Sequence, residues 1–283
     1  MLSDALGFQI EAADTRELLA DSRTALVGSL VDALEIRGFL EVELFSDVPL
    51  GSGLGGSSAL TVALAGALEA SSPRDLSGCD RVALARDAET RVLGKPAGVQ
   101  DYYPALAGGL HRILLEPGAT RAERTDLDAG GWERHLTLFD TGAAHSSGLN
   151  NWEIFRARLE GDREVAAALE GVRRAAAAMA QAASVHDFPA MGAALREEWE
   201  ARRRLAPVVS SPLIERAVEA ALAAGAWGGK ACGAGGGGCV VFLSPAGCTP
   251  SVRESLRRLP QGTVLSVHAE NRGLALKETE SLR

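Results

Sequence analysis

The sequence predicts an α+β fold in two domains, with sheets that are antiparallel or mixed. Helical and strand-like segments follow one another without the strict alternation that a parallel α/β sheet requires. Residues 41–44 alternate glutamate with valine and leucine, which is typical of an antiparallel strand with one solvated face. After Asp140 the expected segments are mainly helical, so we place the two domains at residues 1–140 and 141–283.

In the first domain, apolar residues at helical spacing predict helices over residues 16–37, 58–70 and 80–93. Strands are expected over residues 8–11, 39–45, 108–115 and 135–139. In the second domain, the expected helices span residues 152–159, 165–183, 188–205, 213–224 and 251–259. A second glycine-rich loop, residues 228–238, leads into a strand over residues 239–243, and a last strand is expected over residues 263–268.

The composition is that of a globular protein and excludes several classes of function. A net charge of −8 argues against a general nucleic-acid binder. No uninterrupted apolar segment is long enough to span a membrane, and the first thirty residues show no signal-peptide pattern, so we expect a cytoplasmic location. The four cysteines form no C-x-x-C pair, which favours free thiols over disulfides or metal ligands.

A glycine-rich loop precedes the helix expected over residues 58–70. Glycine lets backbone N–H groups approach an anion closely, and the helix adds its positive N-terminal end, so the loop predicts a phosphate site. The residues expected to bind the ligand are Pro49, Gly51, Ser52, Gly53, Leu54, Gly55, Gly56, Ser57, Ser58 and Ala59. The structural alternative is a turn that only joins a strand to a helix.

Two other nucleotide-binding patterns match this loop less well. Gly51 and Gly56 have the spacing of a P-loop, but Ser57 stands where that motif requires lysine. Gly51, Gly53 and Gly56 match the dinucleotide fingerprint, which would indicate an NAD-dependent oxidoreductase. The antiparallel character of residues 41–44, and the four residues 46–49 between that strand and the loop, weigh against the fingerprint.

Three segments in order resemble the GHMP small-molecule kinases. Residues 49–59 resemble their ATP-binding loop, P-x-x-x-G-L-G-S-S-A. Residues 89–101, followed by Gly108 and Gly109, are similar to the segment with a metal-binding glutamate and a catalytic aspartate. Residues 230–239 resemble the third motif, K-x-x-G-A-G-G-G-G-C. Residues 51–59 and 100–103 are most similar to the heptose-phosphate and fucose kinase branch. Residues 141–148 and 151–152 also resemble that branch, with His145 where it has arginine.

The resemblance implies ATP- and Mg²⁺-dependent phosphoryl transfer to a hydroxyl of a small sugar or sugar phosphate. It implies that Ser58 and Glu89 hold Mg²⁺ and that Asp101 is the catalytic residue, which accepts or orients the hydroxyl proton. A loop near the phosphate and sugar would comprise Gly233, Ala234, Gly235, Gly236 and Gly237. A homodimer is compatible with the resemblance, whereas nucleic-acid and membrane partners are not expected.

Each of these residues also has a structural alternative. Glu89 could be a solvated helix residue, Asp101 could cap a helix, and Lys95 and Lys230 could be exposed tips of loops. The chain also lacks the N-terminal motif of the family, which carries a basic residue near the phosphates. We therefore expect an N-terminal sheet that is incomplete, with an exposed edge. The alternative function is a catalytically inactive, truncated protein that binds a nucleotide or a partner.

Overall fold

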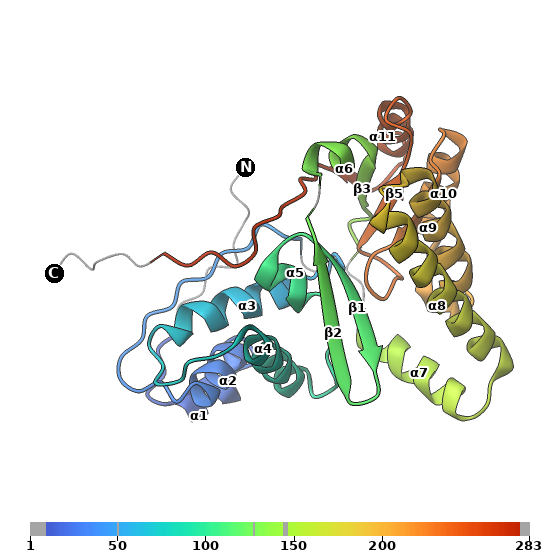
Figure 1. Cartoon of the computed structure of the whole chain (residues 1–283). Helices are drawn as coiled ribbons and strands as arrows, with labels where there is room; N and C mark the ends of the chain where they lie inside the picture. Colours follow the sequence, from blue (N-terminus) through green and yellow to red (C-terminus); the bar gives the residue numbers. More distant parts are fainter. Residues whose placement is uncertain (1–9, 50, 127, 144–146, 278–283) are drawn as a thin grey trace. The chain divides into compact units, whose positions relative to one another are not determined.

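The computed structural model describes residues 10–49, 51–126, 128–143 and 147–277 (Figure 1). These residues form two compact units. Unit 1 takes in the described parts of residues 1–48, 55–127 and 270–283, and unit 2 those of residues 49–54 and 128–269. The first glycine loop is therefore divided between the units after Leu54, and the chain returns to unit 1 at Glu270. The domain ranges 1–140 and 141–283 stay a prediction.

Unit 1 consists of helices and a two-stranded antiparallel hairpin. Its elements are α1 (Thr15–Ala20), α2 (Ala25–Ala33), α3 (Gly56–Glu69), α4 (Gly78–Leu93), α5 (Tyr102–Ala107), β1 (Leu110–Glu116) and β2 (Ala119–Thr125). One apolar face of α3 packs with α2 and α4 through Leu64, Leu68 and Leu30. Val62, also on α3, packs with Tyr102 at the start of α5. The helix that follows the glycine loop is thus held on two sides.

Local sequence signals determine the ends of α4. Ser77 and Asp80 form a capping box at its start, and Gly94 in the left-handed conformation ends it. Ala85 is fully buried on this helix, and Glu89 follows it by four residues. Since residues four apart share one face of a helix, Glu89 lies on the inner face of α4 rather than on its solvated side.

Unit 2 is built on a four-stranded antiparallel sheet in the order β4-β5-β3-β6. The strands are β3 (Leu136–Asp140), β4 (Gly228–Ala231), β5 (Cys239–Leu243) and β6 (Thr263–Leu265). The helical elements are α6 (Ala129–His135), α7 (Ser147–Leu159), α8 (Arg163–Ser184), α9 (Phe188–Arg202), the 3-10 turn η1 (Pro207–Val209), α10 (Pro212–Ala223) and α11 (Thr249–Arg257).

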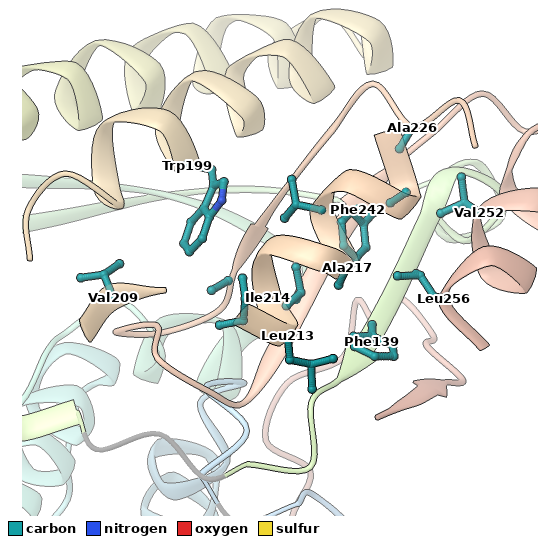
Figure 2. Packing of buried hydrophobic residues seen from close by; sticks show 14 residues of the cluster. Phe139, Trp199, Val209, Leu213, Ile214, Ala217, Ala226, Phe242, Val252 and Leu256 are labelled. Carbon is teal, nitrogen blue, oxygen red and sulfur yellow. The ribbon is translucent and has the colours of Figure 1, made fainter. Parts of the chain in front are cut away.

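The core of unit 2 lies between the sheet and its helices (Figure 2). Phe139 on β3 and Phe242 on β5 are fully buried, as are Trp199 on α9 and Ile214 on α10. Strands β4 and β5 are joined by residues 232–238, the part of the second glycine loop outside the strands, and the Ala231–Val240 pair holds the two ends of this part together.

The strand expected over residues 39–45 is wrong. The segment has no regular structure, and the side chains of Phe39 and Phe45 are 94% and 74% exposed. A strand needs a neighbour to pair its backbone N–H and C=O groups, and alternation alone does not supply one. The antiparallel entry strand that we set against the dinucleotide fingerprint is therefore not present.

Other predicted elements are shifted or divided. The helix expected over residues 16–37 is interrupted between α1 and α2, where Asp21 is extended and the Thr24 hydroxyl donates to the Leu18 carbonyl. β2 was not expected, although Pro117 and Gly118 mark the hairpin turn before it. Of the strand expected over residues 8–11, residues 8 and 9 lie outside the described part, and residues 10 and 11 are not in a strand.

Across the described ranges, none of the helices combines the length and apolar character that crossing a bilayer requires.

Candidate active site

One group of candidate site residues lies at the N-terminus of α3 in unit 1. Gly55 has a φ of +73°, a left-handed conformation that favours glycine, and its carbonyl accepts the first helical hydrogen bond from the Ala59 N–H. Among the described residues, no side chain caps the helix at this position. The first-turn N–H groups and the positive end of the helix dipole are therefore available to an anionic ligand.

Glu89 lies beside this helix start and accepts hydrogen bonds from three hydroxyl groups. Ser57 donates to Oε1 and Tyr102 donates to Oε2. Ser58 Oγ lies 3.4 Å from Oε2. Ser58 and Tyr102 are buried, and Glu89 itself is half-buried. Glu89 is thus not a solvated helix residue, and the sequence-predicted pair Ser58 and Glu89 is brought together.

Asp101 lies against the same glycine. A Cβ atom built on Gly55 would come within 3.0 Å of Asp101 Cβ and Cγ, so only glycine lets the two segments approach this closely. Asp101 occupies the N-cap position of α5, but its side chain makes no capping hydrogen bond. Its Oδ2 accepts a hydrogen bond from Gln100 Nε2 at 3.1 Å. The helix-cap alternative for Asp101 is therefore not what the side chain does.

The environment of Asp101 alters its acidity. Burial raises the pKa of the carboxyl group above its ordinary value, the hydrogen bond from Gln100 lowers it, and the negative charge of Glu89 raises it again. Burial is the largest effect, so the net shift is upward. A raised pKa brings a carboxylate closer to the range in which it can accept a proton from a substrate hydroxyl.

A second group of candidate site residues is in unit 2, where Ser52 and Gly53 lie against the second glycine loop. The Cys239 N–H donates to the carbonyl of Ser52, whose side chain is buried, at 2.7 Å. A Cβ on Gly53 would lie 2.7 Å from the Cys232 carbonyl oxygen, and one on Gly238 would lie 2.6 Å from that of Ser52. These backbone contacts require glycine, and they join two loops that are far apart in the sequence.

The second glycine loop is also fixed by η1. Gly235 and Gly236 have φ values of +83° and +80°. A Cβ at these positions would lie 2.2 Å from the Val209 carbonyl oxygen and 2.6 Å from that of Val208, respectively. The Gly236 N–H donates to the Val209 carbonyl at 2.7 Å. The loop is consequently an ordered structure in unit 2 and not a free turn.

Lys230 is not an exposed loop tip. Its Nζ lies 2.9 Å from Glu198 Oε1, which also accepts from Arg202 Nε at 2.5 Å. Only 21% of the Lys230 side chain and 9% of that of Glu198 are exposed. Burial, followed by the nearby charge of Arg202, lowers the pKa of Lys230. Glu198 was missed at the sequence level, because nothing in a helical sequence marks which glutamate faces inward toward a distant lysine.

The predicted site residues thus form two groups, one in each unit. Unit 1 holds Gly55, Gly56, Ser57, Ser58, Ala59, Glu89 and Asp101. Unit 2 holds Pro49, Gly51, Ser52, Gly53, Leu54, Gly233, Ala234, Gly235, Gly236 and Gly237. Lys95 is half-buried and belongs to neither group. His145 lies outside the described residues, and Leu50 does as well.

The donor set of unit 1 fits Mg²⁺. Among residues 10–49, 51–126, 128–143 and 147–277, no group of three or more His, Cys, Asp or Glu side chains could hold a metal ion. Mg²⁺ is ordinarily bound through one or two carboxylates together with waters and substrate phosphates, and it prefers oxygen ligands. Ser58 Oγ and the Glu89 carboxylate are such ligands, so the residues present are compatible with this ion.

Comparison with known proteins identifies the family. Sequence models of the GHMP kinase N-terminal and C-terminal domains match residues 23–109 and 169–258. A galactokinase from Mycobacterium bovis is 30% identical over 247 residues, which cover 77% of this chain and 68% of the relative. The chain belongs to the GHMP kinase family.

Other GHMP kinases are also similar to this chain in sequence or in structure. The D-glycero-alpha-D-manno-heptose 7-phosphate kinase of Campylobacter jejuni is 29% identical over 207 residues, or 70% of this chain. The match spans 59% of that relative's length. The crystal structure of Lactococcus lactis galactokinase complexed with galactose has the same fold, with a TM-score of 0.70 at 15% identity over 96% of this chain and 78% of that one. The predicted α+β, two-domain GHMP kinase fold is confirmed.

Proposed function

We propose that this GHMP kinase transfers a phosphoryl group from ATP to a hydroxyl group of a small sugar or sugar phosphate. The observation that carries the proposal is the packing of the Asp101 carboxyl group against Gly55 at the uncapped start of α3, with Glu89 and Ser58 beside it. The names of the relatives, a heptose phosphate kinase and a galactokinase, support a sugar as the acceptor.

Each group of the site has a part in this reaction. The N–H groups at the start of α3 would bind the phosphates of ATP, and Asp101 would accept or orient the proton of the attacking hydroxyl. Ser58 and Glu89 would hold Mg²⁺, which neutralises charge on the transferring phosphate when it is bound. In unit 2, N–H groups of the second glycine loop other than those of Gly236 and Gly238, which donate to the carbonyls of Val209 and Ala143, would donate to phosphate or sugar oxygens.

The test is direct phosphoryl transfer. The purified chain is incubated with labelled ATP, Mg²⁺ and a panel of hexoses, heptoses and their phosphates, with and without EDTA. We expect labelled product from at least one sugar and its loss with EDTA. ATP binding without transfer to any acceptor would contradict the proposal.

A second candidate is a nucleotide- or partner-binding protein without catalysis. The observation that favours it is segment 39–45, which has no regular structure and in which Phe39 and Phe45 expose most of their apolar surface. The same incubation distinguishes the two, because this candidate predicts ATP binding and no labelled sugar. The homodimer and the cytoplasmic location stay predictions.

A further inference from the structure

Tyr102 is the most deeply buried polar contact of Glu89. Its ring is fully buried and packs with Val62 on α3 and with Val82 and Ala85 on α4. Its hydroxyl donates to Glu89 Oε2. Tyr102 is also the first residue of α5 and follows Asp101 directly. One side chain therefore connects the inner face of α4 to the segment that carries Asp101.

The three hydroxyl partners of Glu89 differ in how firmly they are held. Ser57 is exposed, and the Ser58 hydroxyl is at 3.4 Å, a long distance for a hydrogen bond. The Tyr102 ring has only two side-chain torsions, and it is fully buried against apolar residues of α3 and α4. The hydrogen bond from Tyr102 consequently restrains the Glu89 carboxylate more than either serine does. This hydrogen bond occupies one lone pair of Oε2, and the carboxylate keeps other lone pairs that can bind a cation.

We propose that Tyr102 is a positioning residue that orients the Glu89 carboxylate for the divalent cation. The inference rests on the proposed function, in which Glu89 is a cation ligand. A ligand that is oriented before the cation arrives loses less conformational freedom on binding, so affinity rises without a new contact to the ion. Because Asp101 and Tyr102 are adjacent, the same hydrogen bond also sets the catalytic residue relative to the cation ligand.

The experiment compares two tyrosines that share one hydrophobic cluster. Tyr102→Phe removes the hydroxyl that reaches Glu89, whereas Tyr103→Phe removes that of a half-buried neighbour packed on the same cluster. Mn²⁺ binding is measured by electron paramagnetic resonance in the absence of sugar, and the Mg²⁺ dependence of phosphoryl transfer is measured separately. We expect Tyr102→Phe to weaken Mn²⁺ binding about tenfold, the scale of one hydrogen bond to a charged group, and Tyr103→Phe to change it less than about twofold.

A second pair of variants keeps the size of the side chain constant. 4-Aminophenylalanine at position 102 retains a hydrogen-bond donor, and 4-methylphenylalanine does not. The amino variant is expected to bind Mn²⁺ within about threefold of the wild type and the methyl variant about tenfold more weakly. Equal Mn²⁺ affinity in the two variants would overturn the positioning role, even if Tyr102→Phe does not fold.

Mn²⁺ binding and phosphoryl transfer by the wild-type chain show whether a negative result refutes the role of Tyr102 or the proposed function. If the wild-type chain binds Mn²⁺ and transfers phosphate, and Tyr102→Phe binds Mn²⁺ as tightly, only the role of Tyr102 is refuted. If the wild type transfers no phosphate, the proposed function fails first. A loss of Mn²⁺ affinity in Tyr102→Phe, with kcat recovered at saturating Mg²⁺, would support positioning over a purely structural role.

Discussion

At the scale of single residues, Asp101 is the carboxyl group that best fits the role of proton acceptor. The sequence resemblance predicted the residue, but it did not predict the groups that adjust its acidity. Gln100 precedes it in the chain, and its side-chain amide donates to Asp101 Oδ2. Glu89 comes near it only because α4 and α5 share one hydrophobic cluster. The acidity of Asp101 therefore depends on tertiary packing as well as on its neighbour.

Replacement of Gln100 by alanine is expected to shift the pH profile of the reaction. The amide hydrogen bond stabilises the ionised form of Asp101 and so lowers the pKa of this carboxyl group. Without it the pKa rises further, and the ionised base forms only at higher pH. The acidic limb of kcat/KM should therefore move to higher pH, whereas Gln181→Ala on the exposed side of α8 should leave it in place. A shift to lower pH in Gln100→Ala would contradict this account.

At the scale of elements, the second glycine loop depends on contacts that a methyl group would prevent. Gly235 combines a φ of +83° with a Cβ position only 2.2 Å from the Val209 carbonyl oxygen. Gly247 has open space at its Cβ position and lies in a turn of the same unit. The two glycines thus form a matched pair for testing whether the loop is ordered.

Gly235→Ala is expected to lower the free energy of unfolding by about 1–3 kcal/mol, because it adds backbone strain and a steric overlap. Gly247→Ala should change it by less than about 0.5 kcal/mol. Urea unfolding followed by circular dichroism measures both. Equal stability of the two variants would show that the loop moves away from η1 without cost.

A second prediction at this scale concerns the ion pairs that Glu198 forms with Lys230 on β4 and with Arg202. Glu198 joins Lys230 and Arg202 in a largely buried site, and its Oε2 has no hydrogen-bond partner among the described residues. Removing the negative charge leaves two cations close together, so Glu198→Gln is expected to cost about 3 kcal/mol of stability. Glu200 forms an exposed pair with Arg203, and Glu200→Gln should cost less than about 1 kcal/mol. Thermal and urea unfolding of both variants provide the comparison, and similar losses would refute a buried cluster.

Elements with strong local signals were predicted well from the sequence. The capping box at Ser77 marks the start of α4, and Gly94 marks its end. The end of the first glycine loop marks the start of α3. The strand expected over residues 39–45 failed because its existence depends on a partner elsewhere in the chain. The contact of Lys230 with Glu198 could not be predicted for the same reason. Local chemistry is visible in a sequence, whereas pairing between distant segments is determined by the fold.

At the scale of the whole molecule, the predicted site residues are divided between the two units, and the first glycine loop runs through both. The first glycine loop contributes Pro49–Leu54 to unit 2 and continues directly into Gly55 and α3 of unit 1. The three motifs in their order were sufficient to predict the GHMP kinase fold. The central claim of the account is narrower: the carboxyl group of Asp101 serves the chemical step and not the binding of ATP.

The most direct measurement compares Asp101→Ala with Asp87→Ala in single-turnover phosphoryl transfer and in ATP binding by calorimetry. Asp87 is exposed on α4 and pairs with Arg86, so its loss should change neither quantity. The account predicts that Asp101→Ala slows phosphoryl transfer about 10²–10⁴-fold while the Kd for ATP stays within about threefold of the wild-type value. Transfer by Asp101→Ala at the wild-type rate would contradict it.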